Sequence, residues 1–341
     1  MIIVMKPGSS DEQVDEIVKV LKTIGLGAHV SKGDLITIIG VIGDKKRLNE
    51  IPLDLMPGVD KLVPIVESYK LVSKSFRPEP SVIDIKGIKV GGKEIVIMAG
   101  PCAVESEQQI HDTAKAVRKS GAKFLRGGAF KPRTSPYAFQ GLEEDGLKMI
   151  YDAAKENDLL IVSEVISEKT LEVADKYVDA FQIGARNVQN FQLLKEVGKS
   201  GKPVVLKRGP ATTIEEWLNA AEYIVSEGNN NVILCERGIR TFETATRNTL
   251  DLSAVPVVKR HSHLPIIVDP SHAAGKVDYV SPLAKAAIAA GADGLIVEVH
   301  PDPRHALSDA AQQLTPELFD TLCKDISKMA SILEREFEYG K

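Results

Sequence analysis

Four residues of the types that bind metal ions stand at or just beyond the ends of apolar runs, although they lie far apart in the chain: Cys102, His272, Glu298 and Asp309. The runs IVIMAGPC and LPIIVDPSH end at the first two, GLIVEVH contains the third, and the fourth lies in the polar loop that follows. A thiolate, an imidazole and two carboxylates suit a borderline divalent cation and leave a position for a substrate oxygen. The pattern predicts a metal-assisted enzyme.

Cationic side chains also follow the apolar runs. There are seven of them: Arg126, Lys131, Arg133, Arg186, Lys207, Arg208 and Arg237. The net charge of the whole chain is −4, so the positive charge is concentrated at the ends of these runs and is not a property of the whole surface. They predict a small substrate with several negative charges, such as phosphate and carboxylate groups. The alternative for any single cation is an ion pair with a carboxylate at a strand end, such as Glu164 or Glu236.

Other residues of the same types have simpler interpretations. Cys235 and Cys323 are expected to be small core residues. His300 is either a substitute metal ligand or a neighbour of the metal site. Asp269 could bind the metal or a substrate hydroxyl, and Asp309 also resembles the N-cap of a helix.

From Lys93 onward, eight short apolar runs alternate with helical patterns: EIVIMAG, KFLRGG, LLIVSEV, AFQIGA, PVVLKRG, NVILCERG, LPIIVDP and GLIVEVH. Helix starts are indicated at Ser106 with Gln109, at Thr213 with Glu216, and at Thr315-Pro316. Eight β-α units predict a (β/α)8 TIM barrel over residues 93–341, which places all the strand ends at one mouth. A doubly wound open sheet is the alternative.

Residues 1–70 predict a smaller unit. Its order of strands and helices, β-α-β-β-α-β, is typical of a ferredoxin-like fold. The first helix is expected to start with a capping box formed by Ser9 and Glu12, and the second, short and polar, lies near 44–50. Residues 71–92 are expected to form a linker and a small hairpin that covers the bottom of the barrel.

Composition narrows the class of protein. The chain has 341 residues, of which 43% are hydrophobic and 26% charged, as in soluble globular proteins. Its charge gives no reason to expect nucleic acid or a membrane surface as a partner. It opens on a strand-like segment without a leader, and no apolar run approaches the length of a membrane span. Three cysteines without a close pair favour the cytosol.

Seven segments together resemble one enzyme family, the 3-deoxy-D-arabino-heptulosonate 7-phosphate (DAHP) synthases. They are GPC (100–102), LRGGAFKPRTSPYAFQG (125–141), IGARN (183–187), LKRG (206–209), CERG (235–238), DPSH (269–272) and EVHPDP (298–303). The resemblance covers the whole predicted barrel. Residues 1–70 are similar to the ferredoxin-like regulatory domain found on one branch of that family.

The resemblance implies a condensation of phosphoenolpyruvate with erythrose 4-phosphate, the first step of the shikimate pathway, with a divalent metal ion. Manganese is preferred, and iron, cobalt and zinc also suit the ligands. By the same resemblance, the metal ligands are Cys102, His272, Glu298 and Asp309. Phosphoenolpyruvate is held by Arg126, Lys131, Arg186, Lys207 and Arg237, and the aldose phosphate by Arg133, Thr134 and Ser135.

In this reaction, carbon 3 of phosphoenolpyruvate attacks the aldehyde carbon that the metal ion polarises, water adds to carbon 2, and phosphate leaves. The candidate catalytic residues are Lys131, Lys207, Glu164, Cys102 and His272. Lys207 or a metal-bound water could transfer protons, and Glu164 could act on the attacking water. The sequence leaves these roles open.

Three alternatives have distinct expectations. The sister enzyme that makes 3-deoxy-D-manno-octulosonate 8-phosphate from arabinose 5-phosphate shares the barrel layout, but Pro132 in KPRTS disfavours it. A Schiff-base aldolase could use Lys207 or Lys131 as nucleophile, yet it would need none of the metal ligands. A non-catalytic amino-acid sensor would not need the cationic cluster.

An enzyme with an attached sensor is the favoured form. In the branch that the chain resembles, the small domain binds tyrosine or phenylalanine and inhibits the enzyme. His29 and Ser31 match positions that contact the phenolic hydroxyl, although an exposed strand end explains them equally well. The resemblance also implies a homotetramer.

Overall fold

The computed structural model describes residues 1–341 apart from 34–35, 44–47, 49–50, 64–67, 133–134 and 341. The chain divides into two compact units, Met1–Ser68 and Tyr69–Lys341. Each unit has a hydrophobic core of its own. In the described ranges, none of the helices combines the length and apolar character needed to span a membrane.

The first unit is an antiparallel sheet with strand order β2-β3-β1-β4 and a helix, α1, packed on one face. Its elements are β1 (Ile2–Met5), α1 (Asp11–Thr23), β2 (Gly27–Lys32), β3 (Thr37–Ile42) and β4 (Val59–Val63). This arrangement confirms the ferredoxin-like fold. The predicted helix near 44–50 falls mostly outside the described residues.

Helix α1 begins one residue later than the sequence suggests. The predicted capping box of Ser9 and Glu12 is wrong, because the Ser9 hydroxyl donates to the carbonyl oxygen of Lys6 at 2.7 Å instead. Ser10 is the N-cap: its Oγ accepts from the Gln13 amide, and the Gln13 side chain accepts from the Ser10 amide at 3.0 Å. The two groups satisfy each other's free backbone donors.

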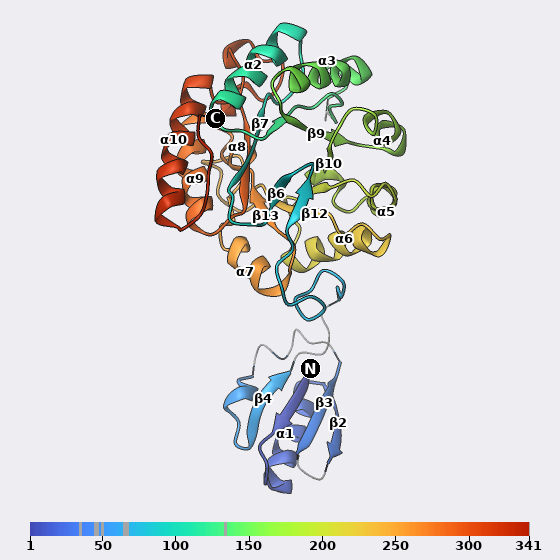
Figure 1. The fold of residues 1–341 in the computed structure, drawn as a ribbon. Coiled ribbons are helices and arrows are strands. Elements are labelled where there is room, and N and C mark those ends of the chain that lie inside the picture. Colours follow the sequence, from blue (N-terminus) through green and yellow to red (C-terminus); the bar gives the residue numbers. More distant parts are fainter. Residues whose placement is uncertain (34–35, 44–47, 49–50, 64–67, 133–134, 341) are drawn as a thin grey trace. The chain divides into compact units, whose positions relative to one another are not determined.

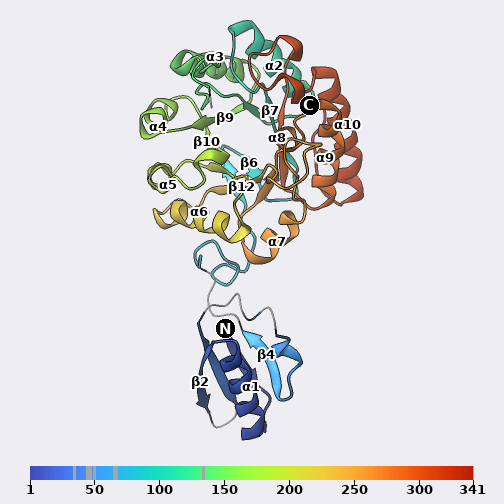
Figure 2. The same cartoon turned by 180° about the vertical axis from the view of Figure 1, so that it is seen from behind.

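The second unit is a closed barrel of eight parallel strands, each paired with the next in the chain. The strands are β7 (Val96–Gly100), β8 (Phe124–Arg126), β9 (Leu160–Val165), β10 (Ala180–Ile183), β11 (Val204–Lys207), β12 (Val232–Glu236), β13 (Ile266–Val268) and β14 (Gly294–Glu298). All eight coincide with the predicted runs. Figure 1 and Figure 2 look along the barrel from opposite ends and show its ring of helices.

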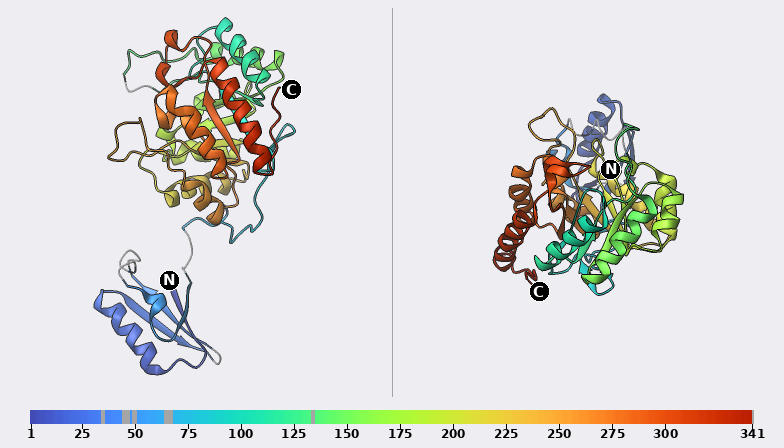
Figure 3. Two further views of the ribbon diagram at one scale, coloured as in Figure 1. Left: turned by 90° about the vertical axis from the view of Figure 1, so that its left-hand side faces the viewer. Right: turned by 90° about the horizontal axis from the view of Figure 1, so that it is seen from above.

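The helices of that ring are α2 (Glu107–Lys119), α3 (Glu143–Glu156), α4 (Glu168–Ala174), α5 (Phe191–Lys199), α6 (Ile214–Ser226), α7 (Ala254–His261), α9 (Val277–Ala289) and α10 (Pro316–Ile332), and the short helix α8 (Pro270–Ala274) follows β13 inside the ring. Three predicted starts are confirmed, since Ser106, Thr213 and Thr315 are side-chain N-caps. Helices α9 and α10 cover one side of the barrel together (Figure 3).

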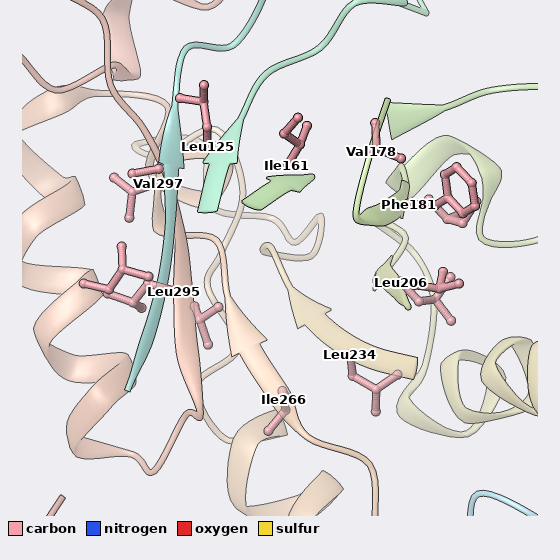
Figure 4. Close-up of a cluster of buried hydrophobic side chains, with 14 of the residues drawn as sticks. Leu125, Ile161, Val178, Phe181, Leu206, Leu234, Ile266, Leu295 and Val297 are labelled. Atoms are coloured by element: carbon pink, nitrogen blue, oxygen red, sulfur yellow. The ribbon is translucent and has the colours of Figure 1, made fainter. Parts of the chain in front are cut away.

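The barrel unit has two layers of core. Side chains such as Leu125, Phe181 and Leu234 point outward from the strands and pack against the helices (Figure 4). A smaller inner cluster, which includes Met98 and Phe124, fills the barrel itself. Because both faces of every strand are buried, the strands have continuous apolar sequences rather than alternating ones.

A hairpin of β5 (Ile83–Ile85) and β6 (Ile88–Val90) belongs to the inner cluster. Ile83, Ile85 and Val90 are all buried and pack with the side chains inside the barrel. The hairpin lies at the N-terminal ends of the strands, where Lys86 forms an ion pair of 2.6 Å with Asp179, the residue before β10. The barrel is therefore closed at the end opposite its mouth.

The segment that precedes the hairpin is bound to the barrel by side chains of α6 and of the loop before β13. The Glu222 carboxylate accepts from the amides of Leu71 and Val72 at 2.8 and 3.1 Å. His263 contacts the Leu71 carbonyl oxygen through Nε2 and the Ser81 hydroxyl through Nδ1, each at 2.8 Å. Residues predicted as a linker thus have fixed partners on the barrel.

We expect the stability of the protein to fall below pH 6.5 partly because of His263. Burial lowers the pKa of this histidine in the folded state, so the unfolded chain binds the proton more tightly. Stability is then fully present above about pH 6.5, the ordinary histidine value, and is lost as the pH falls. His263→Gln should lower the melting temperature at pH 7.5 but flatten its decline towards pH 5.5. An unchanged decline would contradict this assignment.

Candidate active site

The four candidate metal ligands come together at the C-terminal mouth of the barrel. Cys102 lies two residues beyond β7, His272 is in α8 directly after β13, and Glu298 ends β14. Asp309 precedes the short 3-10 helix Ala310–Gln312. The backbone of Asp309 has the left-handed conformation, with φ of 50°, and its side chain caps no helix. It is directed instead towards the other candidates.

The ligand atoms of Cys102, Glu298 and Asp309 all lie within 4.8 Å of one another. His272 Nε2 is 3.4 Å from Glu298 Oε1 and 3.8 Å from Asp309 Oδ2. The other ring nitrogen of His272, Nδ1, is 2.7 Å from Asp269 Oδ2. A carboxylate in that place orients the imidazole with Nε2 towards a metal ion. The chemistry and spacing of the four donors therefore fit a divalent ion.

Burial and neighbouring charges set the protonation of these groups. Burial, together with Glu298, raises the pKa of the Cys102 thiol to about 12. Burial lowers the pKa of His272. Burial alone would raise the pKa of Asp309, but His272 and Arg247 outweigh it and hold that pKa at about 2. A metal ion that binds here would displace the thiol proton and meet a neutral imidazole and a charged carboxylate.

Each candidate ligand that would be anionic when it binds a metal ion also has a cation beside it. The pairs are Arg126 Nη1 with Glu298 Oε1 (2.9 Å), Lys131 Nζ with Cys102 Sγ (3.1 Å) and Arg247 Nη1 with Asp309 Oδ1 (3.3 Å). Carboxylates this close would otherwise repel each other.

Next to these residues is a pocket of about 360 Å³. Its cationic lining comprises Arg126, Lys131, Arg186, Lys207, Arg237, Arg240 and Arg247. The structure thus brings together all five residues predicted to hold phosphoenolpyruvate. Arg240, Arg247 and Asn248 were not predicted, because they lie within the loop after the sixth run and not directly at the end of that run.

For Arg208, the alternative interpretation is confirmed: this cation forms ion pairs with carboxylates. Its guanidinium bonds to Glu236 at 2.9 Å and to Asp251 at 2.8 Å, and it does not line the pocket. The adjacent Lys207 does line it, and Lys207 Nζ lies 2.5 Å from Asp269 Oδ2. Asp269 is therefore shared by Lys207 and His272, and despite its burial their charges hold its pKa well below the usual range.

Other predicted residues lie away from the cluster. His300 Nε2 is 3.4 Å from Glu105 Oε2, and its Nδ1 accepts from the Asp302 amide, so it is a neighbour of the site and not one of the clustered ligands. Cys235 and Cys323 are fully buried core residues, as expected.

The predicted aldose phosphate site is described only in part. Arg133 and Thr134 lie outside the described residues. Ser135 is exposed, and its Oγ accepts from the Tyr137 amide at 3.3 Å.

The predicted effector residues lie in the first unit. His29 and Ser31 are both exposed on the edge strand β2, two residues apart and so on the same face of the sheet. The intervening Val30 packs with α1, which places the pair on the face away from that helix.

Glu164 enters the pocket from β9 and accepts from Gln182 Nε2 at 3.3 Å. Gly184 makes this position possible, because a Cβ atom there would lie only 2.0 Å from Glu164 Oε1. We expect Gly184→Ala to displace the carboxylate and to lower kcat by about 10²-fold, the effect of a misplacement of about 1 Å in an active site. Circular dichroism and steady-state kinetics would check this, and wild-type kcat in a folded variant would refute it.

Comparisons with known proteins agree with these observations. The sequence model of the DAHP synthetase I family matches residues 73–335, and that of the DAHP synthase ferredoxin-like domain matches residues 1–67. The phospho-2-dehydro-3-deoxyheptonate aldolase of Thermotoga maritima is 50% identical over 98% of each chain. A crystal structure of the DAHP synthase from T. maritima covers 98% of each chain, with a TM-score of 0.80 at 49% identity.

The sister activity is represented by more distant relatives. The 2-dehydro-3-deoxyphosphooctonate aldolase of Syntrophotalea carbinolica is 30% identical over 74% of this chain and 96% of its own. The DAHP synthase models match both units of this chain, and the T. maritima aldolase matches the chain along both of them. These matches favour the DAHP synthases over the sister enzymes. The chain is an enzyme that belongs to the DAHP synthetase I family and has the ferredoxin-like domain of DAHP synthases at its N-terminal end.

Proposed function

We propose that this enzyme condenses phosphoenolpyruvate with D-erythrose 4-phosphate, which gives DAHP and phosphate and opens the shikimate pathway. One observation carries the proposal: a pocket lined by seven cations of the described residues lies directly beside a cluster of Cys, His, Glu and Asp side chains. Two phosphorylated substrates require several cations, and an aldehyde requires a group that polarises its oxygen.

Arg126 supports the binding of an anion deep in the pocket. The residue is 5% exposed, and Nη1 donates to the Pro101 carbonyl oxygen and to Glu298. Among the described residues, its buried Nε is left without an acceptor. A buried donor without a partner costs about 1–3 kcal/mol, so an oxygen of phosphoenolpyruvate is a natural partner for it.

A divalent ion would be held by Cys102, His272, Glu298 and Asp309, and Mn²⁺ is the first choice, with Fe²⁺, Co²⁺ and Zn²⁺ as alternatives. When bound, the ion supplies Lewis-acid polarisation of the aldehyde carbonyl.

The side chains of the pocket do the rest. Lys131 Nζ is 2.7 Å from the Cys102 carbonyl oxygen and reaches the metal cluster, so it can donate a proton to the aldehyde oxygen as carbon 3 attacks. Glu164 faces the same pocket and can accept a proton from the water that adds to carbon 2. Lys207 and the arginines hold the two anions in position, which lowers the entropy cost of the reaction.

Tyrosine or phenylalanine is the proposed inhibitor, bound through the first unit. The match to the DAHP synthase ferredoxin-like domain and the exposed pair His29 and Ser31 support this proposal. The hydroxyl of tyrosine could bond to both side chains, which would favour it over phenylalanine. The enzyme is proposed to act as a homotetramer, which light scattering would test.

The experiment measures phosphoenolpyruvate consumption with erythrose 4-phosphate and Mn²⁺, while tyrosine is titrated. We expect consumption that tyrosine inhibits. Consumption indifferent to tyrosine would keep the reaction and exclude tyrosine as the effector, and the same titration with phenylalanine would then test the alternative. Consumption with arabinose 5-phosphate but not with erythrose 4-phosphate would transfer the enzyme to the sister activity. Borohydride treatment in the presence of substrate should trap no adduct on Lys131 or Lys207.

A further inference from the structure

The loop that carries Asp309 also contacts the other candidate ligands. Ser308 Oγ is 3.0 Å from Cys102 Sγ, and the Gln313 side chain accepts from the Cys102 amide at 3.0 Å. Gln312 Nε2 donates to Glu298 Oε2 at 2.7 Å. One short segment, 308–313, therefore supports three of the four ligands at once.

Arg247 joins this segment from a different loop, the one between β12 and α7. Its Nη1 donates to Gln312 Oε1 at 2.9 Å and lies 3.3 Å from Asp309 Oδ1. Gln312 is 2% exposed, so its amide has no access to water as an alternative partner. With Arg247 on the oxygen, the amide nitrogen must face Glu298, and a reversed amide would place oxygen against carboxylate. Arg247 thereby fixes the orientation of Gln312.

The backbone around Arg247 is attached to the helix of the fourth ligand. The amides of Arg247 and Asn248 donate to the carbonyl oxygens of Ala274 and Ala273 in α8 at 3.2 and 2.9 Å. Asn248 Nδ2 donates to the carbonyl oxygen of His272 at 3.0 Å. The close approach needs a glycine at 275, because a Cβ atom there would lie 2.5 Å from the Arg247 Cβ.

We infer that Arg247 is a positioning residue of the metal site, which holds Asp309 directly and Glu298 through Gln312 while it is anchored on the helix of His272. This inference rests on the proposed metal site and adds to it a residue outside the ligand set. The carboxylates of Glu298 and Asp309 repel each other, and Arg247 is placed to keep them convergent.

The test is the affinity of the full-length chain for Mn²⁺, measured without substrates by electron paramagnetic resonance of the free ion. For Arg247→Met we expect a Kd about 10- to 100-fold above that of the wild type, the usual effect of losing a partner of a metal ligand. Arg247→Lys, which can reach only one acceptor at a time, should recover part of the affinity. Arg240→Met is the matched control, since Arg240 lines the same pocket but forms no ion pair with the four ligands in the described structure, and its Kd should stay within about 2-fold.

Gln312 gives an independent check through a double-mutant cycle. If Arg247 acts partly through Gln312, the losses of Arg247→Met and Gln312→Leu will be less than additive in the double variant. Wild-type affinity in both Arg247 variants would overturn the inference while the metal site stands. A wild-type chain that binds no Mn²⁺ would overturn the metal site itself, and the inference with it. Melting temperatures of all variants would show that any loss is local.

Discussion

Replacement of Cys102 by serine is expected to abolish Mn²⁺-dependent activity, with a fall in kcat/KM of at least about 10³-fold. The loss of a metal ion that polarises the aldehyde removes several kcal/mol of transition-state stabilisation, and each 1.36 kcal/mol is a factor of ten. Cys102 contributes one of the atoms that lie within 4.8 Å of one another in the cluster. A serine hydroxyl does not ionise in this buried place and is a poor ligand. Steady-state kinetics and the metal content of the purified variant would measure the effect.

A second cysteine provides the control. Cys323 is a buried residue of α10 in the core between that helix and the barrel strands. Cys323→Ala should retain activity within about 2-fold, because loss of the sulfur atom leaves only a small cavity. Full activity of Cys102→Ser with bound Mn²⁺ would refute the assignment of this thiol as a ligand.

Replacement of Arg126 by methionine should lower kcat/KM for phosphoenolpyruvate by at least about 10³-fold. Two effects add: the substrate loses a charged donor, and the carboxylate of Glu298, a residue that is 1% exposed, loses its partner 2.9 Å away. Breaking a buried ion pair from one side costs about 3–5 kcal/mol, much of it from the charge left behind. Initial rates over a range of phosphoenolpyruvate concentrations would show this as loss of saturation.

Two further arginine variants separate the possible causes. Arg126→Lys keeps the charge but loses the planar fork, so it should recover only a small part of the activity. Arg304→Met, at an exposed position in the loop after β14, should behave as the wild type. Normal phosphoenolpyruvate saturation in Arg126→Met would contradict the proposed role. The Mn²⁺ affinity of the same variant would show how much of the loss comes from Glu298.

The barrel was predictable because its strands are buried on both faces. Each gives a continuous apolar run, such as residues 232–235, and the residues that follow the runs share one mouth whatever the details of packing. Because both faces of each strand are apolar, the sequence does not show which of two consecutive residues points into the barrel. Lys207 and Arg208 are therefore indistinguishable in the sequence, although one enters the pocket and the other pairs with Glu236 and Asp251.

Loop residues were predictable only when they followed a strand directly. Arg247 lies ten residues beyond Arg237, in a loop whose course no periodicity encodes, and its position depends on hydrogen bonds to α8. Asp309 lies equally far into a loop and is the exception: it was predicted as a carboxylate in the polar loop after GLIVEVH, and the family resemblance added support. The predicted start of α1 was wrong for a similar reason. Ser9 and Ser10 are both residue types that favour the N-cap position, and a hydrogen bond from the Ser9 hydroxyl to the distant Gly58 carbonyl oxygen helps to leave Ser10 as the cap.

The hairpin at the closed end of the barrel determines where this polypeptide can be cut. A fragment that began at Lys93 would lack Ile83, Ile85 and Val90, and water would reach the floor of the barrel interior. A fragment that began at Tyr69 would keep that floor and its attachment to Glu222 and His263. Among the described residues, the core of the first unit, in contrast, draws on side chains between Met1 and Leu62. The hairpin is thus an integral part of the barrel unit, whereas the first unit is built around a core of its own.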